Sequence, residues 1–204
     1  MAKAQTVRRK QMRAATVERK TRETKVSVTL GLDGRGKGSI GTSLGFLDHM
    51  LELLARHGGL DLTVKASGDL HVDDHHLVED VGLVLGSALS DALGAKDRIS
   101  RYGWAIVPMD ESLVMCALDL GGRVHLSYQL ELSKRIKQFS TELVQEFFEA
   151  FVRGARMNLH LRQLAGRNSH HIIEASFKAF AKALGQAVAL STRVSGIPST
   201  KGVL

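Results

Sequence analysis

The sequence predicts an α+β fold built from two similar half-domains that share one core. Segments with alternating apolar residues, typical of half-buried strands, are grouped beside segments with helical apolar spacing. The order helix, strand, loop, helix occurs twice, and the pattern His-His-x-x-Glu opens the last helix of each copy, at residues 75–79 and 170–174. A chain of 204 residues, 44% of them hydrophobic, is long enough to bury such a core.

The internal repeat extends beyond this pattern. Residues 46–51 align with residues 143–148, which places His49 opposite Glu146. Two copies are too few for a solenoid, so they predict two half-domains. We divide the chain into a basic N-terminal extension at residues 1–22, a first half-domain at 23–97, a second at 98–192 and a C-terminal tail at 193–204.

The first half begins with a strand in which Val26, Val28, Leu30 and Leu32 alternate with polar or small residues. The glycine-rich residues 33–38 predict a hairpin connection. The later elements of this half are a helix at 46–57 that ends at two glycines, a strand at 60–66, a loop at 68–74 and a helix from residue 75 to near residue 94.

The second half repeats this order after three strand-like segments. These segments lie at residues 104–109, 113–120 and 124–130. The repeat is completed by a helix at 141–153, a strand at 157–161 and a helix at 169–189, and the residues from 197 to the end are irregular. Strands grouped as hairpins beside helices favour helices on one face of each sheet.

The net charge of +7 comes from the N-terminal extension. Residues 1–22 hold eight Lys or Arg side chains and one Glu, and the rest of the chain carries 20 basic and 20 acidic side chains. A charged tail on a neutral body does not make a nucleic-acid-binding domain. No apolar run approaches the length of a membrane span. We therefore expect a solvated extension, no nucleic-acid partner and no membrane.

Cysteine usage bears on the compartment. Cys116 is the only cysteine and lies in an apolar stretch, which predicts a buried residue and no disulfide within one chain. A reducing cytoplasm fits this pattern. The extension is Arg-rich and acid-poor like a transit peptide, but it lacks serine. We expect a cytoplasmic protein, with an organellar stroma as the alternative if the chain is a trimmed plant-type precursor.

The duplicated His-His-x-x-Glu pattern predicts metal binding, because mid-row divalent metals prefer imidazole and carboxylate ligands. Neighbouring helical residues point about 100° apart, so adjacent histidines cannot easily serve one metal. Surface histidines at helix starts are the alternative, which the duplication disfavours. We infer two metal sites per chain, with ligands drawn from His49, His75, His76, Glu79, Glu146, His170, His171 and Glu174.

Several short segments together give a specific resemblance to the imidazoleglycerol-phosphate dehydratase family of histidine biosynthesis. They lie at residues 22–24, 45–51, 73–76 with 79–80, 108–111, 167–175 and 199–202. The resemblance implies two fused copies of a four-stranded sheet backed by two helices. It also implies a twenty-four-subunit octahedral shell with two Mn²⁺ ions per active site at subunit interfaces.

The same resemblance implies a reaction and residues for it. The family removes water from D-erythro-imidazole glycerol phosphate, a small phosphorylated imidazole, to give imidazole acetol phosphate. By resemblance, Glu23 lies near the substrate hydroxyls and Glu79 or Glu174 borders the reacting carbon, and which of them is the base stays open. The implied phosphate clamp consists of Arg101, Arg123, Lys178, Ser199 and Lys201.

The chemistry explains why such a site needs metals. The proton lost is on a carbon beside an imidazole, with no carbonyl to acidify it. Metal ions on both ring nitrogens would hold an imidazolate, which is a Lewis-acid role. Arg forks match phosphate oxygens, and Lys178 lies one helical turn after Glu174. The rival interpretations are a dinuclear metallohydrolase, and a metal-storing or structural assembly protein with a nucleic-acid-binding tail.

The chain departs from the family pattern at a few positions. Glu146 stands where many members have His, which keeps a ligand but makes the site harder. Residues 119–124 keep Arg123 but lack the usual serine and proline of Asp-x-Ser-Gly-Arg-Pro, so the geometry of this loop stays open. Leu77 replaces a frequent threonine, and we expect little effect.

Overall fold

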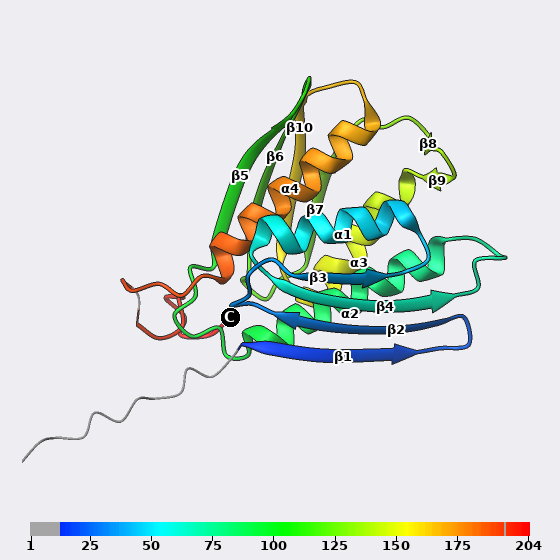
Figure 1. The fold of residues 1–204 in the computed structure, drawn as a ribbon. Helices are drawn as coiled ribbons and strands as arrows, with labels where there is room; N and C mark the ends of the chain where they lie inside the picture. Colours follow the sequence, from blue (N-terminus) through cyan, green and yellow to red (C-terminus); the bar gives the residue numbers. More distant parts are fainter. Residues whose placement is uncertain (1–12, 194) are drawn as a thin grey trace, which may run out of the picture.

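The structure is a computed structural model that describes residues 13–193 and 195–204 (Figure 1). In the first half, strands β1 (Ala14–Lys20), β2 (Thr24–Gly31), β4 (Asp61–Gly68) and β3 (Gly38–Gly41) form one sheet in the order β1-β2-β4-β3. Strands β1, β2 and β4 are antiparallel neighbours, and β3 pairs with β4 in parallel. Helices α1 (Gly45–Gly58) and α2 (His75–Leu93) complete this half.

The second half has the same strand order. Its sheet, β5-β6-β10-β7, consists of β5 (Tyr102–Met109), β6 (Ser112–Asp119), β10 (Asn158–Ala165) and β7 (His125–Gln129). Again the last strand of the order pairs in parallel with its neighbour. Helices α3 (Glu142–Ala155) and α4 (Ser169–Val188) follow, after a short hairpin of β8 (Arg135–Ile136) and β9 (Phe139–Ser140). The predicted α+β class and internal duplication are confirmed by this repeated order.

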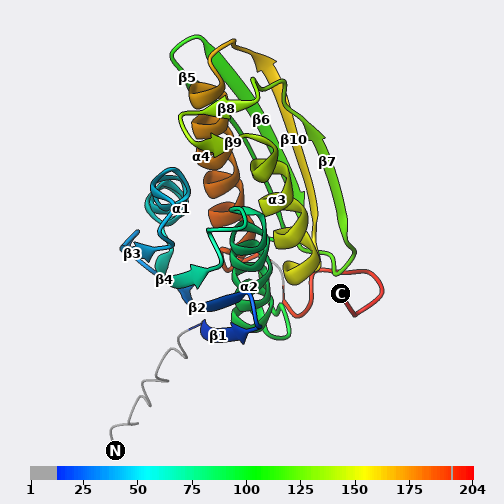
Figure 2. The ribbon, with the colours of Figure 1, turned by 90° about the vertical axis from the view of Figure 1, so that its right-hand side faces the viewer.

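The helices lie between the two sheets (Figure 2). Helix α2 packs on β1 and β2, helix α4 packs on β5 and β6, and the two layers meet where α2 contacts α3 and α1 contacts α4. Phenylalanines fill the middle of the core, where the rings of Phe148 and Phe177 lie 5.0 Å apart. Most buried residues of both halves belong to one connected cluster, and a small second cluster contains Val114, Ile172 and Ala175, so the halves share a main core.

The interpretation of residues 1–22 as a solvated extension is wrong for residues 14–20. They form β1, which pairs along its whole length with β2. Ala15 and Val17 alternate with charged or polar residues and pack partly against the core. The surrounding run of basic residues obscured this short period-two pattern, and pairing with β2 satisfies backbone groups on one side of β1. The part of the predicted extension before Arg13 lies outside the described residues.

The predicted hairpin at residues 33–38 is also wrong. These residues lead from β2 to β3, but β4 lies between those two strands in the sheet. The Asp61 carboxylate accepts the backbone N–H groups of Arg35 and Lys37, so the loop is tied to the start of β4. A Cβ at Gly34 would lie 2.3 Å from the backbone nitrogen of Asp61, so glycine is needed for a close approach and not for a two-stranded turn.

The other predicted helices and strands are present, with ends shifted by a few residues, whereas β3, β8 and β9 were missed. These three strands have two to four residues each, too short to show a clear alternation. Cys116 is fully buried, as expected. No helix within residues 13–193 and 195–204 is long and apolar enough to cross a membrane.

Candidate metal centre

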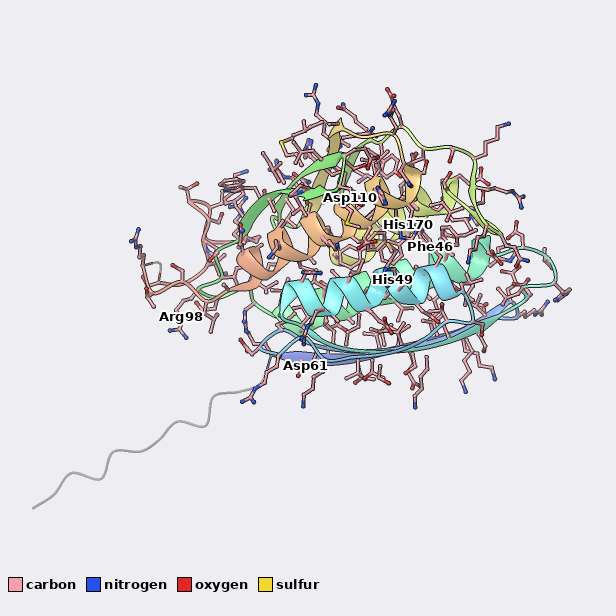
Figure 3. The ribbon with its side chains drawn as sticks, turned by 45° about the horizontal axis from the view of Figure 1, so that its top comes forward. Phe46, His49, Asp61, Arg98, Asp110 and His170 are labelled. Carbon is pink, nitrogen blue, oxygen red and sulfur yellow. The ribbon has the colours of Figure 1, made fainter. Side chains whose placement is uncertain are left out.

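Three predicted ligands meet where α1 lies beside the N-terminal part of α4. Nε2 of His49 is 3.8 Å from Oε2 of Glu174, and Nε2 of His170 is 3.2 Å from the same oxygen. Figure 3 shows His49 and His170 close together, one on each helix. In the described part of the chain, these three form the one group of His, Cys, Asp or Glu whose ligand atoms lie within 4.8 Å of one another. Two nitrogens and an oxygen fit a mid-row divalent metal and leave coordination positions open.

Local structure positions these ligands. The Asn168 side chain accepts the backbone N–H of His170 and so caps the start of α4. Glu174 then lies one helical turn later on the same face. In the first turn of α1, the Asp48 carboxylate accepts hydrogen bonds from the backbone N–H and the hydroxyl of Thr42. These bonds fix the segment that leads into the helix that carries His49.

A cavity of about 880 Å³ opens beside this cluster. His49 and His170 line it on one side, and Phe46, Phe139 and Lys137 line other parts. The Phe46 ring contacts both the Phe139 ring, at 5.1 Å, and the edge of His170, at 5.4 Å. Aromatic walls with a few polar groups are typical of small-molecule sites.

Glu174 is the most enclosed of the gathered ligands, with a side chain that is 11% exposed. Burial by itself would raise the pKa of Glu174, but the hydrogen bond and charge of Lys178, together with His49 and His170, lower it. Nζ of Lys178 lies 2.7 Å from Oε1 of Glu174. The second oxygen, Oε2, is the one that faces the histidines, so the carboxylate is held ionised with one oxygen directed to the cluster.

The corresponding residues of the first repeat do not form such a group. By the repeat, His75, Glu79 and Glu146 correspond to His170, Glu174 and His49. They lie on α2 and α3, which pack together, but Oε1 of Glu79 accepts a hydrogen bond from Arg153 at 2.6 Å. Among the described residues, these ligands lie on neighbouring helices but do not form a group within 4.8 Å of one another.

The second histidine of each pair points elsewhere, as the helix geometry predicted. The ring centroids of His75 and His76 lie 6.3 Å apart and those of His170 and His171 lie 6.2 Å apart, with ring planes inclined at 88° in both pairs. Nδ1 of His76 lies 3.2 Å from Asp69, and Nδ1 of His171 lies 2.7 Å from Glu111. These hydrogen bonds raise the pKa of both histidines, and the contact with His171 lowers the pKa of Glu111.

Glu23 lies in the turn between β1 and β2, near His76. Its carboxylate is 56% exposed and 3.9 Å from Nδ1 of His76. Asp80 of α2 fixes this turn, because its carboxylate accepts hydrogen bonds from Arg19 and from the Thr24 hydroxyl on either side of it. The side chain of Glu23 is thus the most exposed of the three predicted catalytic carboxylates.

Within a single chain, the residues of the predicted phosphate clamp lie in two separate places. Arg101 donates two hydrogen bonds to Asp119 and one to the carbonyl of Pro198, directly before Ser199. A Cβ at Gly122, next to the exposed Arg123, would lie 2.9 Å from the carbonyl carbon of the C-terminal residue, so this loop meets the tail that carries Ser199 and Lys201.

Lys178 lies apart from these residues. The backbone N–H of Arg101 binds the carbonyl of Ala187 near the end of α4. At about 1.5 Å per helical residue, Ala187 is about 20 Å along α4 from Glu174 and about 14 Å from Lys178. One chain therefore holds Lys178 at the metal cluster and the other clamp residues at the far end of α4.

Sequence reasoning missed the carboxylates that hold other site residues. Asp69, Asp80 and Glu111 were not among the predicted site residues, although each contacts one of them or the turn that carries it. The signal was partly available, because Asp80 directly follows the motif and Glu111 lies in the segment 108–111 that carries the resemblance. Their roles depend on tertiary contacts, which spacing does not reveal.

Known proteins match this chain over most of its length. A sequence profile described as imidazoleglycerol-phosphate dehydratase matches residues 42–184. The imidazoleglycerol-phosphate dehydratase of Desulforamulus reducens is 58% identical, over 94% of this chain and 98% of its own. The chain belongs to the imidazoleglycerol-phosphate dehydratase family. A Thermosynechococcus vestitus dehydratase is 55% identical, over 95% of this chain and 93% of its own.

Solved dehydratase structures share the fold. The Staphylococcus aureus imidazoleglycerol-phosphate dehydratase superposes with a TM-score of 0.79 at 40% identity, covering 87% of this chain and 99% of its own. The Pyrococcus furiosus enzyme gives 0.81 at 38% identity, covering 92% and 100%. The two four-stranded sheets with four helices, seen in the described residues, are thus the dehydratase fold. The chain is a hydro-lyase of histidine biosynthesis, which removes the metallohydrolase and storage-protein interpretations.

Proposed function

We propose that this enzyme dehydrates D-erythro-imidazole glycerol phosphate to imidazole acetol phosphate with two Mn²⁺ ions per active site. The observation that carries the metal requirement is the group of His49, His170 and Glu174 beside an open cavity. The comparisons give the dehydratase activity, and the donor set of two imidazoles and a carboxylate supports a mid-row divalent metal. Manganese is the metal implied by the family resemblance.

When bound, the two ions would supply the Lewis acidity that allows both nitrogens of the substrate ring to be held as an imidazolate. The residues of the chain supply the rest. Glu174 is kept ionised by Lys178, so it holds negative charge at the cluster. The Glu79 carboxylate accepts a hydrogen bond from Arg153 of α3. Both carboxylates stay candidates for the base that takes the carbon proton.

Glu23 is suited to a different step. It is the most exposed of the three carboxylates, and its turn is fixed to α2 through Thr24 and Asp80. We assign Glu23 to the substrate hydroxyls, where it can hold the hydroxyl that leaves and pass a proton to it. Positioning by the turn matters because proton transfer needs hydrogen-bond contact.

The clamp would bind the phosphate end of the substrate through charge-assisted hydrogen bonds. Arg123 and Lys201 are exposed, and Ser199 lies beside the Arg101–Pro198 contact. Arg101 has a second task in this assignment, because its hydrogen bond to Pro198 holds the tail that carries Ser199 and Lys201. Lys178 lies at the metal end of the site, where its ammonium pairs with Glu174.

We propose that a complete site combines residues of different copies of the chain. One chain gathers three ligands, holds His76 and His171 outside that group against Asp69 and Glu111, and holds most of the clamp about 20 Å along α4 from Glu174. Assembly to the twenty-four-subunit octahedral shell implied by the resemblance would bring such parts together. No nucleic acid or membrane is needed for this function, and the cytoplasmic location expected from the sequence remains a prediction.

The experiment that tests this proposal combines metal analysis with a dehydration assay. Metal-free protein should be inactive, and Mn²⁺ should restore turnover as it reaches two ions per chain. Zn²⁺ and Mg²⁺ serve as comparison metals, since one prefers fewer ligands and the other prefers oxygen alone. Full turnover by protein verified to contain no metal would overturn the proposal.

A further inference from the structure

The two histidines that turn away from the gathered cluster share one feature. Nδ1 of His171 lies 2.7 Å from Oε2 of Glu111, and Nδ1 of His76 lies 3.2 Å and 3.3 Å from the two oxygens of Asp69. Neither carboxylate belongs to the predicted ligand set. In both half-domains, therefore, a carboxylate faces the same nitrogen of the same histidine in the motif.

The two carboxylates come from different places in the repeat. Asp69 directly follows β4, whereas Glu111 lies in the turn between β5 and β6. In the first half, the turn that corresponds to the one with Glu111 carries Glu23, which lies 3.9 Å from His76 and makes no hydrogen bond with it at that distance. Duplication of one ancestral contact does not explain this arrangement. A requirement at the histidine itself does explain it.

That requirement is that the single proton of each neutral ring stays on Nδ1. A neutral imidazole carries one N–H, and a carboxylate beside Nδ1 holds the proton there and leaves the lone pair on Nε2. Carboxylates in this position fix both the tautomer and the ring orientation of histidines that bind metals. The two carboxylates are themselves partly shielded, since the side chains of Asp69 and Glu111 are 17% and 38% exposed.

Glu111 is held in place by further contacts. Its other oxygen, Oε1, accepts the backbone N–H groups of Arg167 at 3.1 Å and Asn168 at 2.9 Å. These residues immediately precede α4, so Glu111 links the β5–β6 turn to the start of the helix that carries His171. Asp69 is anchored through its backbone N–H, which donates to the carbonyl of Glu23 at 3.0 Å.

We propose that Asp69 and Glu111 are positioning residues that hold the Nδ1 protons of His76 and His171 and thereby present Nε2 of each ring as the coordinating nitrogen. This inference rests on the proposed metal-dependent function. The neighbouring Asp110 does not share the role, because its carboxylate is 3.6 Å from Nε2 of His171 and 70% exposed. Asp110 therefore offers a matched control.

The test uses the full chain and the variants Glu111→Gln, Asp69→Asn and Asp110→Asn. Manganese dissociation is measured by counting free Mn²⁺ with electron paramagnetic resonance. Loss of an outer-shell partner of this kind typically weakens metal binding about 10–100-fold. We expect that loss in the first two variants, with turnover recovering at high Mn²⁺, and wild-type affinity in Asp110→Asn. A variant whose melting temperature falls while its manganese affinity is unchanged would assign the carboxylate a structural role only and overturn the proposal.

A second measurement does not depend on metal. In metal-free protein with ¹⁵N-labelled histidine, at about pH 9 where imidazoles are neutral, the ring nitrogens report the tautomer. His76 and His171 should carry the proton on Nδ1, and Glu111→Gln should change His171 alone while Asp69→Asn changes His76 alone. Wild-type protein that binds no manganese but shows these tautomers would refute the metal function and not the orientation. Nε2-protonated rings in the wild type would refute the orientation.

Discussion

The two half-domains have the same strand order, but they arrange their equivalent metal ligands differently. Between α1 and α4, His49, His170 and Glu174 already lie within 4.8 Å of one another. Between α2 and α3, the Glu79 carboxylate is held instead by Arg153, and its partners are not gathered with it. The backbone frame was duplicated, and in each half a cation holds one oxygen of the Glu carboxylate, but among the described residues only the α1–α4 ligands are gathered.

The halves also differ in what else they contribute. All five predicted clamp residues lie in the second half and the tail, whereas Glu23 lies in the first half. The edge strands are attached differently as well. Strand β1 is tied to α2 by Asp80, which contacts Arg19 and Thr24, whereas β5 meets α4 so closely that a Cβ at Gly103 would lie 1.8 Å from the carbonyl oxygen of Ala183. Asp80 corresponds in the repeat to an alanine, residue 175.

The largest effect is expected from removing a gathered ligand. Because the α1–α4 group needs little reorganisation, metal-free protein should bind one Mn²⁺ per chain in a first phase and a second ion in a later phase. His170→Ala should remove the first phase, with a loss in affinity of at least about a hundredfold, the upper end of what outer-shell changes produce. His75→Ala should remove only the second phase. Both variants should lose turnover.

Isothermal titration with light scattering measures both phases and the mass of the assembly. If the second site is shared between copies, the mass should rise in the second phase only, because ligands shared between subunits link binding to assembly. A single phase of two ions per chain in the wild type would show that the difference between the halves has no consequence for binding.

The next effect concerns the attachment of β1. Asp80→Ala should lower the free energy of unfolding by about 2–3 kcal/mol, because hydrogen bonds to a charged group are lost and Thr24 is left buried without its acceptor. Turnover should fall in parallel through the turn that carries Glu23. Asp97→Ala is the control, since its pair with Arg98 is exposed and should contribute little. Urea unfolding that shows equal stability for both variants would contradict the role given to Asp80.

The sequence predicted most of the frame because hydrophobic periodicity is readable in all four helices and in most strands of five residues or more, down to the five-residue β7. It also identified the repeat, which placed His49 opposite Glu146 and added both to the candidate ligands, without saying which motif each would join. It missed β1 because seven residues rich in charge resemble a solvated tail. It read residues 33–38 as a hairpin connection because strand order is a tertiary property that spacing does not show.

The sequence did not predict the residues that act by holding another site residue in place. Glu111 binds His171 across a separation of sixty positions, and Asp80 reaches Arg19 across sixty-one. Such contacts leave no periodic signal. The spacing did place Lys178 one helical turn after Glu174 on the same face, where the structure shows the two side chains in an ion pair.

A smaller effect tests whether the clamp belongs to the second half alone. Arg123→Ala should raise KM about 10–100-fold, equivalent to one charge-assisted contact, with manganese content unchanged. Arg123→Lys should also be impaired, because Lys lacks the planar fork. Arg101→Ala should act on the tail as well, since Arg101 holds Pro198. Steady-state kinetics with wild-type KM values in all three variants would remove these arginines from the phosphate site.

The smallest expected effect is a difference in stability between two glycine variants, which tests how closely each of the two helix pairs packs. A Cβ at Gly86 of α2 would lie 2.2 Å from the carbonyl oxygen of Phe151 in α3, whereas a Cβ at Gly185 of α4 would lie 2.8 Å from that of Gly58 in α1. Both obstacles are backbone atoms, so the helices themselves must move. Overpacking costs about 1–3 kcal/mol, while replacing glycine by alanine within a helix returns about 1 kcal/mol. Gly86→Ala should therefore destabilise the protein by about 2 kcal/mol and Gly185→Ala by less than about 1 kcal/mol in thermal unfolding. The reverse ranking would show that α1 and α4, which carry the gathered ligands, are the more rigid pair.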